Sequence, residues 1–277
     1  MKSFKVKIIA EAGINHNGNL KKAFRMIDIA NSCGANSIKF QIFNAEEVVT
    51  PSGKMADYAS RNMKSNKKQL DIIKKYQLTE NDHLKIKNYC EKKGIEYLCS
   101  AFDNSSLNFL KKIKLKIFKV PSGEITNYPY LNLLGSFKKK VILSTGMSNV
   151  KEIKKAILIL TNAGTKKNDI SILHCNTDYP TQPKDLNLLA IKKLKKIFKC
   201  QIGLSDHSLG VEASVAAVAL GAKVIEKHFT LSRKMKGPDH LASLEPRELS
   251  NLVKSIRHIE LALGKNKKFA TKSEKKI

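Results

Sequence analysis

The stretch that decides the fold reads GLSDHS at residues 203–208 and VIEKHFT at residues 224–230, followed by KGPD ending at Asp239. It contains two histidines, His207 and His228, and each follows a short apolar segment. Such a segment is typical of a buried strand. Each histidine is therefore expected at the end of a strand.

The run between the two histidines, residues 211–221, consists mainly of Val, Ala and Leu and predicts a helix buried on most of its circumference. A strand, a packed helix and a second strand bring both strand ends to the same edge of a parallel sheet. A carboxylate stands near each histidine, Asp206 and Glu226. One such histidine would more often be a hydrogen-bonded core residue, but two at matching positions favour a divalent metal site at His207 and His228.

The same alternation of strand and helix continues towards the amino terminus. It gives eight units, and eight is the number at which parallel strands close into a barrel. We therefore predict an α/β fold, a (β/α)8 TIM barrel, over residues 1–264. An open doubly wound sheet has the same periodicity, but the first turn lacks GxGxxG, so a dinucleotide site has little support. The predicted strands are 5–10, 36–40, 95–99, 116–120, 140–143, 170–174, 201–203 and 222–225, and the predicted helices are 20–33, 79–93, 106–112, 130–134, 150–163, 186–197, 211–221 and 246–263.

Three segments add detail to this plan. Residues 43–67 are long and polar and are expected to pass over the mouth of the barrel. Thr79 and Asp82 have the spacing of a capping box, and Gly94 is placed to end the helix that follows. Residues 265–277 are polar, lysine-rich and without periodicity, which predicts a linker-like tail.

The composition is strongly basic, with 51 Lys and Arg against 24 Asp and Glu and a net charge of +27. Nucleic-acid binding is one interpretation. However, there is no Trp and no stacking-aromatic pattern, and the lysines come in pairs along helix-like segments, as a solvated outer face would place them. We therefore expect no nucleic acid as a partner, while anionic small molecules remain compatible with the charge. The pairs are 21–22, 67–68, 92–93, 154–155, 192–193 and 195–196.

The five cysteines are widely spread and have no CxxC spacing. They predict reduced, mostly buried thiols of a cytoplasmic protein, and Cys99 and Cys175 are interpreted as packing residues. The first residues lack the basic segment followed by an apolar segment that is typical of a signal peptide. No apolar run approaches the about 20 residues needed to span a bilayer, so no membrane partner is expected.

Polar residues collect where the predicted strands end, as expected if that rim carries the site. Lys39 and Lys119 end apolar strands, where a buried lysine is costly. Snorkelling or an ion pair would explain either alone, but two lysines beside several serines favour a bound anion. Glu11 fits a structural ion pair and a general acid–base role equally well. Of the other histidines, His174 is expected in the core, His83 and His258 are expected to be exposed on helices, and His240 is left open.

Eight motifs, in register over nearly the whole chain, together resemble the sialic acid synthase family, whose members include N-acetylneuraminate, legionaminate and pseudaminate synthases. The motifs are EAGINHNG (11–18), KFQ (39–41), FKVPSGE (118–124), ILSTGM (142–147), LHCNTDYP (173–180), GLSDHS (203–208), IEKHFT (225–230) and GPDH (237–240).

This resemblance implies a TIM barrel that condenses phosphoenolpyruvate with an N-acetylhexosamine, either N-acetylmannosamine or a legionaminate precursor, with the wording of the motifs leaning weakly towards the latter. It also implies a divalent metal, Mn²⁺ with Mg²⁺ or Co²⁺ as alternatives, held by His207 and His228. The implied catalytic acidic residues are Glu11 and Glu226. The residues implied to hold phosphoenolpyruvate are Lys39, Ser100, Lys119, Ser122, Ser144, Thr177 and Ser205, and those implied to contact the sugar are Gln41, Tyr179 and Asp239.

The chain departs from the family pattern in two places. The resemblance implies a C-terminal antifreeze-like domain, which family members usually carry and exchange within a homodimer, and we expect that domain to be absent from this chain. In the sixth-strand motif, Asn176-Thr177-Asp178 differs from the more usual Thr-x-Glu. Three alternatives therefore stay open: another phosphoenolpyruvate–aldose synthase, a truncated inactive homologue, and a basic nucleic-acid-binding protein.

Overall fold

The computed structural model describes residues 6–50, 52–54, 57–63, 68–264 and 267–276. Eight parallel strands form a closed barrel, each hydrogen-bonded to its neighbours in chain order, and β8 closes on β1. The strands are β1 (Lys7–Gly13), β2 (Ser37–Ile42), β3 (Glu96–Ala101), β4 (Ile117–Val120), β5 (Lys140–Ser144), β6 (Ile170–Cys175), β7 (Gln201–Asp206) and β8 (Val224–His228). The predicted TIM barrel is thus confirmed, and the open sheet is excluded because β1 pairs with β8.

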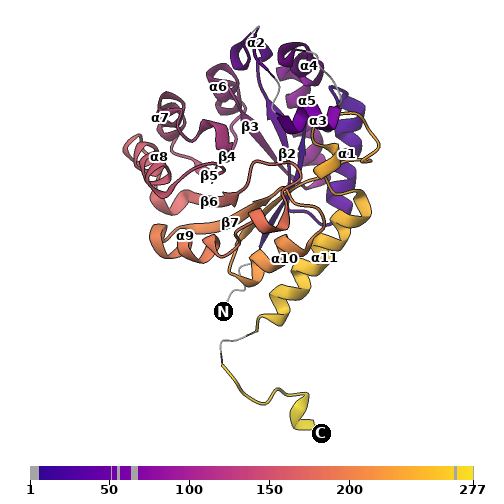
Figure 1. The fold of residues 1–277 in the computed structure, drawn as a ribbon, viewed down its shortest axis with the longest axis vertical. Helices are drawn as coiled ribbons and strands as arrows, with labels where there is room; N and C mark the ends of the chain where they lie inside the picture. The colour runs from indigo at the N-terminus through magenta and orange to yellow at the C-terminus, as the bar shows by residue number, and fades with distance from the viewer. Residues whose placement is uncertain (1–5, 51, 55–56, 64–67, 265–266, 277) are drawn as a thin grey trace.

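Helices surround the strands on the outside of the barrel (Figure 1). The connection from β2 to β3 is the longest and carries α2, α3 and α4 before α5, and α2 packs against α4. The α-helices are α1 (Leu20–Ser32), α2 (Ala45–Val48), α3 (Asp57–Met63), α4 (Gln69–Tyr76), α5 (Glu80–Lys93), α6 (Asn104–Lys112), α7 (Tyr128–Ser136), α8 (Val150–Asn162), α9 (Ala190–Phe198), α10 (Glu212–Ala219) and α11 (Pro246–Ala262).

Side chains alternate between the two faces of each strand, and this alternation builds two cores. Outward-facing residues such as Ile8 and Ala10 of β1 pack against the helices in the main core. Inward-facing residues fill the barrel itself with an apolar layer, formed by Ile9, Leu98, Ile117, Ile142, Leu173 and Val224. Two residues further along these strands the inward side chains are polar on five of the six, with Cys175 on β6 as the exception, so the polar layer rests on the apolar one. The five polar residues are Glu11, Ser100, Lys119, Ser144 and Glu226.

The boundaries differ from the predicted ones in an informative way. Strands β1, β2, β3, β7 and β8 run two or three residues further towards their carboxyl ends than predicted. Polar residues expected just after the strands therefore lie inside them. Residues 43–67, for which no helix was predicted, contain helices α2 and α3. Residues 51, 55–56 and 64–67 lie outside the described residues, as does Lys5 of the predicted first strand.

Local signals at the helix ends behaved as predicted. The capping box of Thr79 and Asp82 forms at the start of α5, and Gly94 ends that helix in the left-handed conformation with φ of 75°. By contrast, α9 begins at Ala190 instead of residue 186, because a 3-10 turn at Pro183–Asp185 precedes it.

His83 corrects a prediction made from its place on a helix. It was expected to be exposed, but it is 0% exposed and its Nδ1 lies 2.9 Å from the hydroxyl of Tyr97 on β3. The turn of α5 that carries it faces the barrel. His258 is exposed, as predicted, and His174 is half-buried with Nε2 2.8 Å from the carbonyl oxygen of Leu186.

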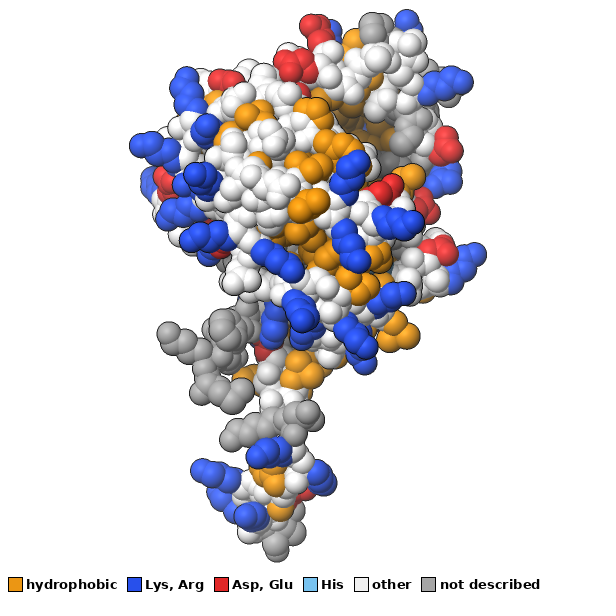
Figure 2. Space-filling model, turned by 90° about the vertical axis from the view of Figure 1, so that its left-hand side faces the viewer, with side chains coloured by type: hydrophobic (Ala, Val, Ile, Leu, Met, Phe, Trp, Pro, Cys, Tyr) orange, Lys and Arg blue, Asp and Glu red, His pale blue; other side chains and the backbone are white. Residues whose placement is uncertain are grey.

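The basic residues are spread over the outer helices. Figure 2 shows Lys and Arg side chains distributed around a band of hydrophobic side chains rather than gathered in one groove of this face. Both lysines of the pairs at 92–93, 154–155, 192–193 and 195–196 are exposed, as predicted, whereas Lys67 lies outside the described residues. Among the helices that the structure describes, none combines the length and the apolar character required to cross a bilayer.

Candidate active site

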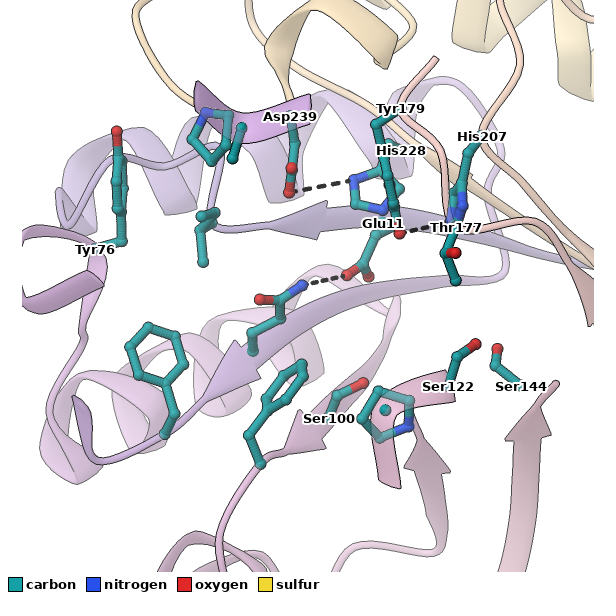
Figure 3. Close-up of a pocket in the computed structure, with 18 of the residues that line it drawn as sticks. Glu11, Tyr76, Ser100, Ser122, Ser144, Thr177, Tyr179, His207, His228 and Asp239 are labelled. Atoms are coloured by element: carbon teal, nitrogen blue, oxygen red, sulfur yellow. Dashed lines mark hydrogen bonds and ion pairs between the residues drawn. The ribbon is translucent and has the colours of Figure 1, made fainter. Parts of the chain in front are cut away.

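A cavity of about 430 Å³ opens at the carboxyl ends of the strands. All fourteen residues predicted for the site line it, and ten of its lining residues are labelled in Figure 3. Nine of the fourteen project from the last residues of strands and five from the loops that follow. The strand positions are Glu11, Lys39, Gln41, Ser100, Lys119, Ser144, Ser205, Glu226 and His228, and the loop positions are Ser122, Thr177, Tyr179, His207 and Asp239.

The floor of the cavity is a buried layer of two lysines and two carboxylates. Lys39 Nζ lies 3.3 Å from Glu11 Oε2 and 3.4 Å from Glu226 Oε2, and it donates a 3.0 Å hydrogen bond to Ser100 Oγ. Lys119 Nζ lies 3.5 Å from Glu226 Oε1. Each of the four charged residues is at most 3% exposed. Burial of these charges is tolerated because each ammonium faces a carboxylate.

Burial and ion pairing shift the pKa values of the two carboxylates in opposite directions. Burial raises the pKa of Glu11 to about 7, against the opposing effect of Lys39. Burial also acts on Glu226, but Lys119 and Lys39 outweigh it and lower its pKa to about 2. Burial lowers the pKa of Lys119. At neutral pH the floor therefore holds one firmly ionised carboxylate and one that can gain or lose a proton.

Hydroxyl groups form the wall next to Lys119. Ser122 Oγ accepts a 2.9 Å hydrogen bond from the backbone N–H of Gly146. A Cβ at Gly146 would lie 2.8 Å from that Oγ and 2.5 Å from Cγ2 of Thr177, so a glycine is needed for the three segments to meet. Ser144 Oγ is buried without a hydrogen-bond partner. The wall thus presents hydroxyls, and one of them is unsatisfied.

The two imidazoles meet above this floor, as the sequence predicted. Their ring centroids are 5.3 Å apart (Figure 3). Nδ1 of His207 lies 2.5 Å from the carbonyl oxygen of Asn176, and because a carbonyl only accepts, Nδ1 carries the proton. The unprotonated Nε2 of His207 faces the hydroxyl of Tyr179 at 3.0 Å. Burial acts to lower the pKa of His207, but Cys175 and the carbonyl of Asn176 outweigh it and raise the pKa. In the neutral form of His207, the lone pair on Nε2 is directed into the cavity.

His228 is buried with no hydrogen-bond partner for its Nδ1, which lies 3.9 Å from Oδ2 of Asp239. Burial lowers the pKa of His228 well below its usual value and raises that of Asp239 to about 6. A buried, unsatisfied imidazole nitrogen beside a second available imidazole suits a divalent cation. Within the described chain, no group of three or more His, Cys, Asp or Glu side chains is arranged to hold a metal, so the protein itself would supply two nitrogen ligands.

Two sequence interpretations need correction. Asp206 does not join His207, because it faces outwards from β7 and pairs with Lys227 at 2.9 Å. Cys175 was assigned to packing, yet it lines the cavity with its Sγ 3.8 Å from Nδ1 of His207. Burial opposes ionisation of this thiol, but His207 and Lys119 together lower its pKa.

One side of the cavity is apolar, and its residues were not among the predicted site residues, although residues 43–67 were expected to cross the mouth. This apolar wall comes from the β1 turn, the β2–β3 connection and the loop after β3, and Tyr76 of α4 stands at its edge (Figure 3). Phe43 and Phe102 lie edge to face with centroids 6.4 Å apart. The motif segments do not include these positions, apart from the turn after β1. The apolar wall comprises Ile14, Phe43, Val48, Ile72, Ile73, Tyr76 and Phe102.

Comparisons with known proteins agree with this geometry. The model of the NeuB family matches residues 26–268. The chain is 47% identical over 272 residues to the N,N'-diacetyllegionaminic acid synthase of Campylobacter jejuni, covering 98% of this chain and 81% of that protein. It is 38% identical over 258 residues to the human N-acetylneuraminate-9-phosphate synthase, covering 93% of this chain and 71% of that protein.

A solved structure leads to the same conclusion. The crystal structure of the N-acetylneuraminic acid synthetase of Leptospira borgpetersenii in complex with citrate superposes with a TM-score of 0.86 at 36% identity. The match covers 99% of this chain and 90% of that one. The family model and the identity to these relatives over nearly the whole chain show that this chain belongs to the NeuB family.

Proposed function

We propose that the protein condenses phosphoenolpyruvate with an N-acetylated hexose to give a sialic-acid-type keto-sugar acid and inorganic phosphate. The observation that carries this proposal is that one cavity combines the lysines of the floor and the hydroxyls of the wall with the imidazoles of His207 and His228. The floor suits a small anion, and the imidazoles suit a cation that activates a carbonyl. The family relationship supports the same reaction.

The floor is the binding site we propose for phosphoenolpyruvate. Among the described residues, Lys119 Nζ faces a carboxylate at 3.5 Å and donates one long hydrogen bond, 3.4 Å, to the carbonyl oxygen of Val120, which leaves donors for a ligand. The unsatisfied hydroxyl of Ser144 would also gain a partner from a bound phosphate or carboxylate. Charge-assisted hydrogen bonds of this kind are the strong ones. The remaining proposed contacts are Lys39, Ser100, Ser122, Thr177 and Ser205.

The metal site we propose is formed by His207 and His228, with Mn²⁺ as the first candidate and Mg²⁺ or Co²⁺ as alternatives. Both residues fit, because one directs an unprotonated nitrogen into the cavity and the other has an orphaned buried nitrogen. A divalent cation there would polarise the aldehyde of the open-chain sugar. The sugar itself would contact Gln41, Tyr179 and Asp239.

Glu11 is the proposed proton-transfer group. In the reaction, C3 of phosphoenolpyruvate forms a bond to the aldehyde carbon, and the aldehyde oxygen takes up a proton. A water then adds to C2 with loss of one proton. The bond between C2 and the phosphate oxygen breaks, the C2 hydroxyl becomes the keto group, and its proton leaves with the phosphate. One proton is given and one is taken, and a carboxyl with a pKa of about 7 can do both at neutral pH. Glu226, held ionised, would stabilise the positive charge that develops at C2.

The apolar wall supports an acceptor of the legionaminate type. The relative that is 47% identical is named for an N,N'-diacetyl product, and a second acetamido group adds a methyl that favours an apolar contact. A phosphorylated acceptor would require basic side chains at the mouth. Among the described residues that line the cavity, the lysines are Lys39 and Lys119, both in the floor.

Phosphate release from phosphoenolpyruvate, measured with a panel of acceptors with and without Mn²⁺, tests the proposal. We expect turnover with the diacetamido hexose that precedes legionaminate, less with N-acetylmannosamine, and none with arabinose 5-phosphate or without metal. His207→Ala should abolish the metal-dependent turnover and keep the fold. Turnover with arabinose 5-phosphate alone, or full activity in His207→Ala, would contradict the proposal.

Two further parts of the proposal concern the setting of the enzyme. All five cysteines are free thiols, which supports a reducing cytoplasm. A homodimer is proposed from the family relationship.

A further inference from the structure

Asp206 and Lys227 form an ion pair outside the cavity, and each is next in sequence to one of the two histidines, His207 and His228. Asp206 Oδ2 and Lys227 Nζ are 2.9 Å apart, and both side chains are 0% exposed. Asp206 and Lys227 are also direct partners in the register of β7 and β8. The ion pair therefore joins the two strands at the level where the histidines leave them.

Lys227 also holds the chain on the far side of His207. Its Nζ donates a 2.6 Å hydrogen bond to the carbonyl oxygen of Ser208. Asp206 Oδ1 accepts from both the N–H and the hydroxyl of Ser208, at 2.9 and 2.6 Å, and Ser214 of α10 donates to Oδ2 at 2.6 Å. Lys227 therefore contacts both Asp206, which precedes His207, and Ser208, which follows it. The carboxylate of Asp206 also binds Ser208.

On the side that faces the cavity, β7 and β8 are joined one residue earlier on each strand. Ser205 and Glu226 are register partners, and Ser205 Oγ donates a 3.0 Å hydrogen bond to Glu226 Oε1. This inner contact lies in the reaction cavity, where substrate would compete for it. The outer ion pair is sealed from solvent and substrate, so it can hold the strands in the same geometry throughout turnover.

We propose that Lys227 is a positioning residue that, through Asp206 and Ser208, holds the imidazoles of His207 and His228 at the separation a divalent cation requires. This proposal rests on the proposed metal site. It assigns to Lys227 no contact with substrate or cation. Lys227 acts by fixing the backbone on either side of His207 and the register of β8, the strand that carries His228.

Lys227→Met tests this, since it removes the ammonium and keeps most of the side-chain volume. We expect the affinity for Mn²⁺, measured from the EPR signal of the free ion, to fall by about 10- to 100-fold, as for other outer-shell partners of metal ligands. Binding of phosphoenolpyruvate at the floor should change little without metal. Unchanged Mn²⁺ affinity would overturn the proposal.

A double variant separates positioning from a general loss of stability. Lys227→Met leaves Asp206 buried without its partner, which is strongly destabilising, whereas Asp206→Asn combined with Lys227→Met removes both charges. We expect the melting temperature to recover in the double variant and the Mn²⁺ affinity to stay low. Recovery of both together would show that stability alone was affected. Tyr130→Phe, which deletes a buried 2.9 Å hydrogen bond to Ala101 on the outer face of β3, is the control and should keep full Mn²⁺ affinity.

A metal-free measurement distinguishes this proposal from the proposed function. With isotope-labelled histidine, the ring signals of His207 and His228 should shift or broaden in Lys227→Met, while those of the other five histidines stay in place. If the wild-type protein bound no Mn²⁺ but these signals moved, the metal role would fall and the positioning role would stand. Unmoved signals would refute the positioning role.

Discussion

Each of the buried lysines of the floor has a different set of contacts, and this difference suggests different roles. Lys39 faces both carboxylates and Ser100, so its donors are largely engaged. Lys119 faces one carboxylate at 3.5 Å and is the less satisfied of the two. A ligand anion therefore gains more from Lys119, whereas the removal of Lys39 would leave Glu11 and Glu226 without the cation between them.

Lys119→Met is expected to raise the KM for phosphoenolpyruvate roughly tenfold to a hundredfold, because a hydrogen bond to a charged group contributes about 1.5–3 kcal/mol. Steady-state kinetics with varied phosphoenolpyruvate measure this. Lys116→Met, three residues earlier and exposed, is the matched control and should leave the KM unchanged. Equal KM values for both variants would remove Lys119 from the anion site.

The buried His83 makes the free energy of unfolding depend on pH. Burial lowers its pKa to about 4 from the usual 6.5, so between these values the unfolded chain binds a proton that the folded chain does not. Stability should therefore fall as the pH drops from 6.5 to 4, by about 3 kcal/mol from this residue. His83→Gln should flatten the pH dependence of urea unfolding in this window. His258→Gln, exposed on α11, is the control, and an equal flattening there would contradict the assignment.

Helix α3 links two loops that carry proposed sugar-binding residues. Asn62 donates hydrogen bonds to the carbonyl oxygens of Pro238, at 2.7 Å, and Tyr179, at 3.4 Å. Pro238 precedes Asp239, and Tyr179 lies against His207. The element that crosses the mouth thus holds the loops from β6 and β8 together.

Asn62→Ala is expected to raise the KM for the sugar about fivefold, given about 1 kcal/mol for a lost hydrogen bond. The KM for phosphoenolpyruvate, which binds at the floor, should not change. Arg61→Ala removes only an exposed ion pair to Asp178, 3.2 Å long, and should alter neither constant. A rise in both KM values for Asn62→Ala would indicate a general disturbance of the cavity.

The strands and helices described from Lys7 to Ala262 form one barrel, and the assignment of residues 1–264 to its domain and of 265–277 to a tail stays a prediction. Residues 267–276 are all exposed, and Figure 1 shows them beyond the end of α11, away from the barrel. Residues 265–266 and 277 lie outside the described residues. The last buried side chain of α11 is Ile256.

Truncation after Gly264 should therefore leave the melting temperature within about 2 °C of the full chain, because surface residues contribute little to stability. Differential scanning calorimetry measures this. Truncation after Asn251, which removes the buried Leu252, Val253 and Ile256, should abolish cooperative unfolding. A fall of several degrees on removal of the tail would show that it packs against the barrel.

The sequence by itself determined the closed barrel and predicted residues that the structure brings together in one cavity. Strand and helix periodicity are local properties, and eight repeats of them leave little choice of fold. Strand ends of a barrel converge on one rim, so polar residues at those ends, from Glu11 to His228, could be assigned to one cavity before their contacts were known.

Only the tertiary structure decided which way each side chain faces and what meets it. Asp206 and Glu226 are both carboxylates beside a histidine, yet alternation along the strand sends one outwards to Lys227 and the other into the cavity. The sequence predicts a strand but does not fix its first and last residues, so it does not decide which alternate side chains face the cavity. A shift of one residue would exchange the two faces. The apolar wall and buried His83 escaped prediction for a related reason, since their surroundings come from segments far apart in the chain and exist only once the barrel has closed.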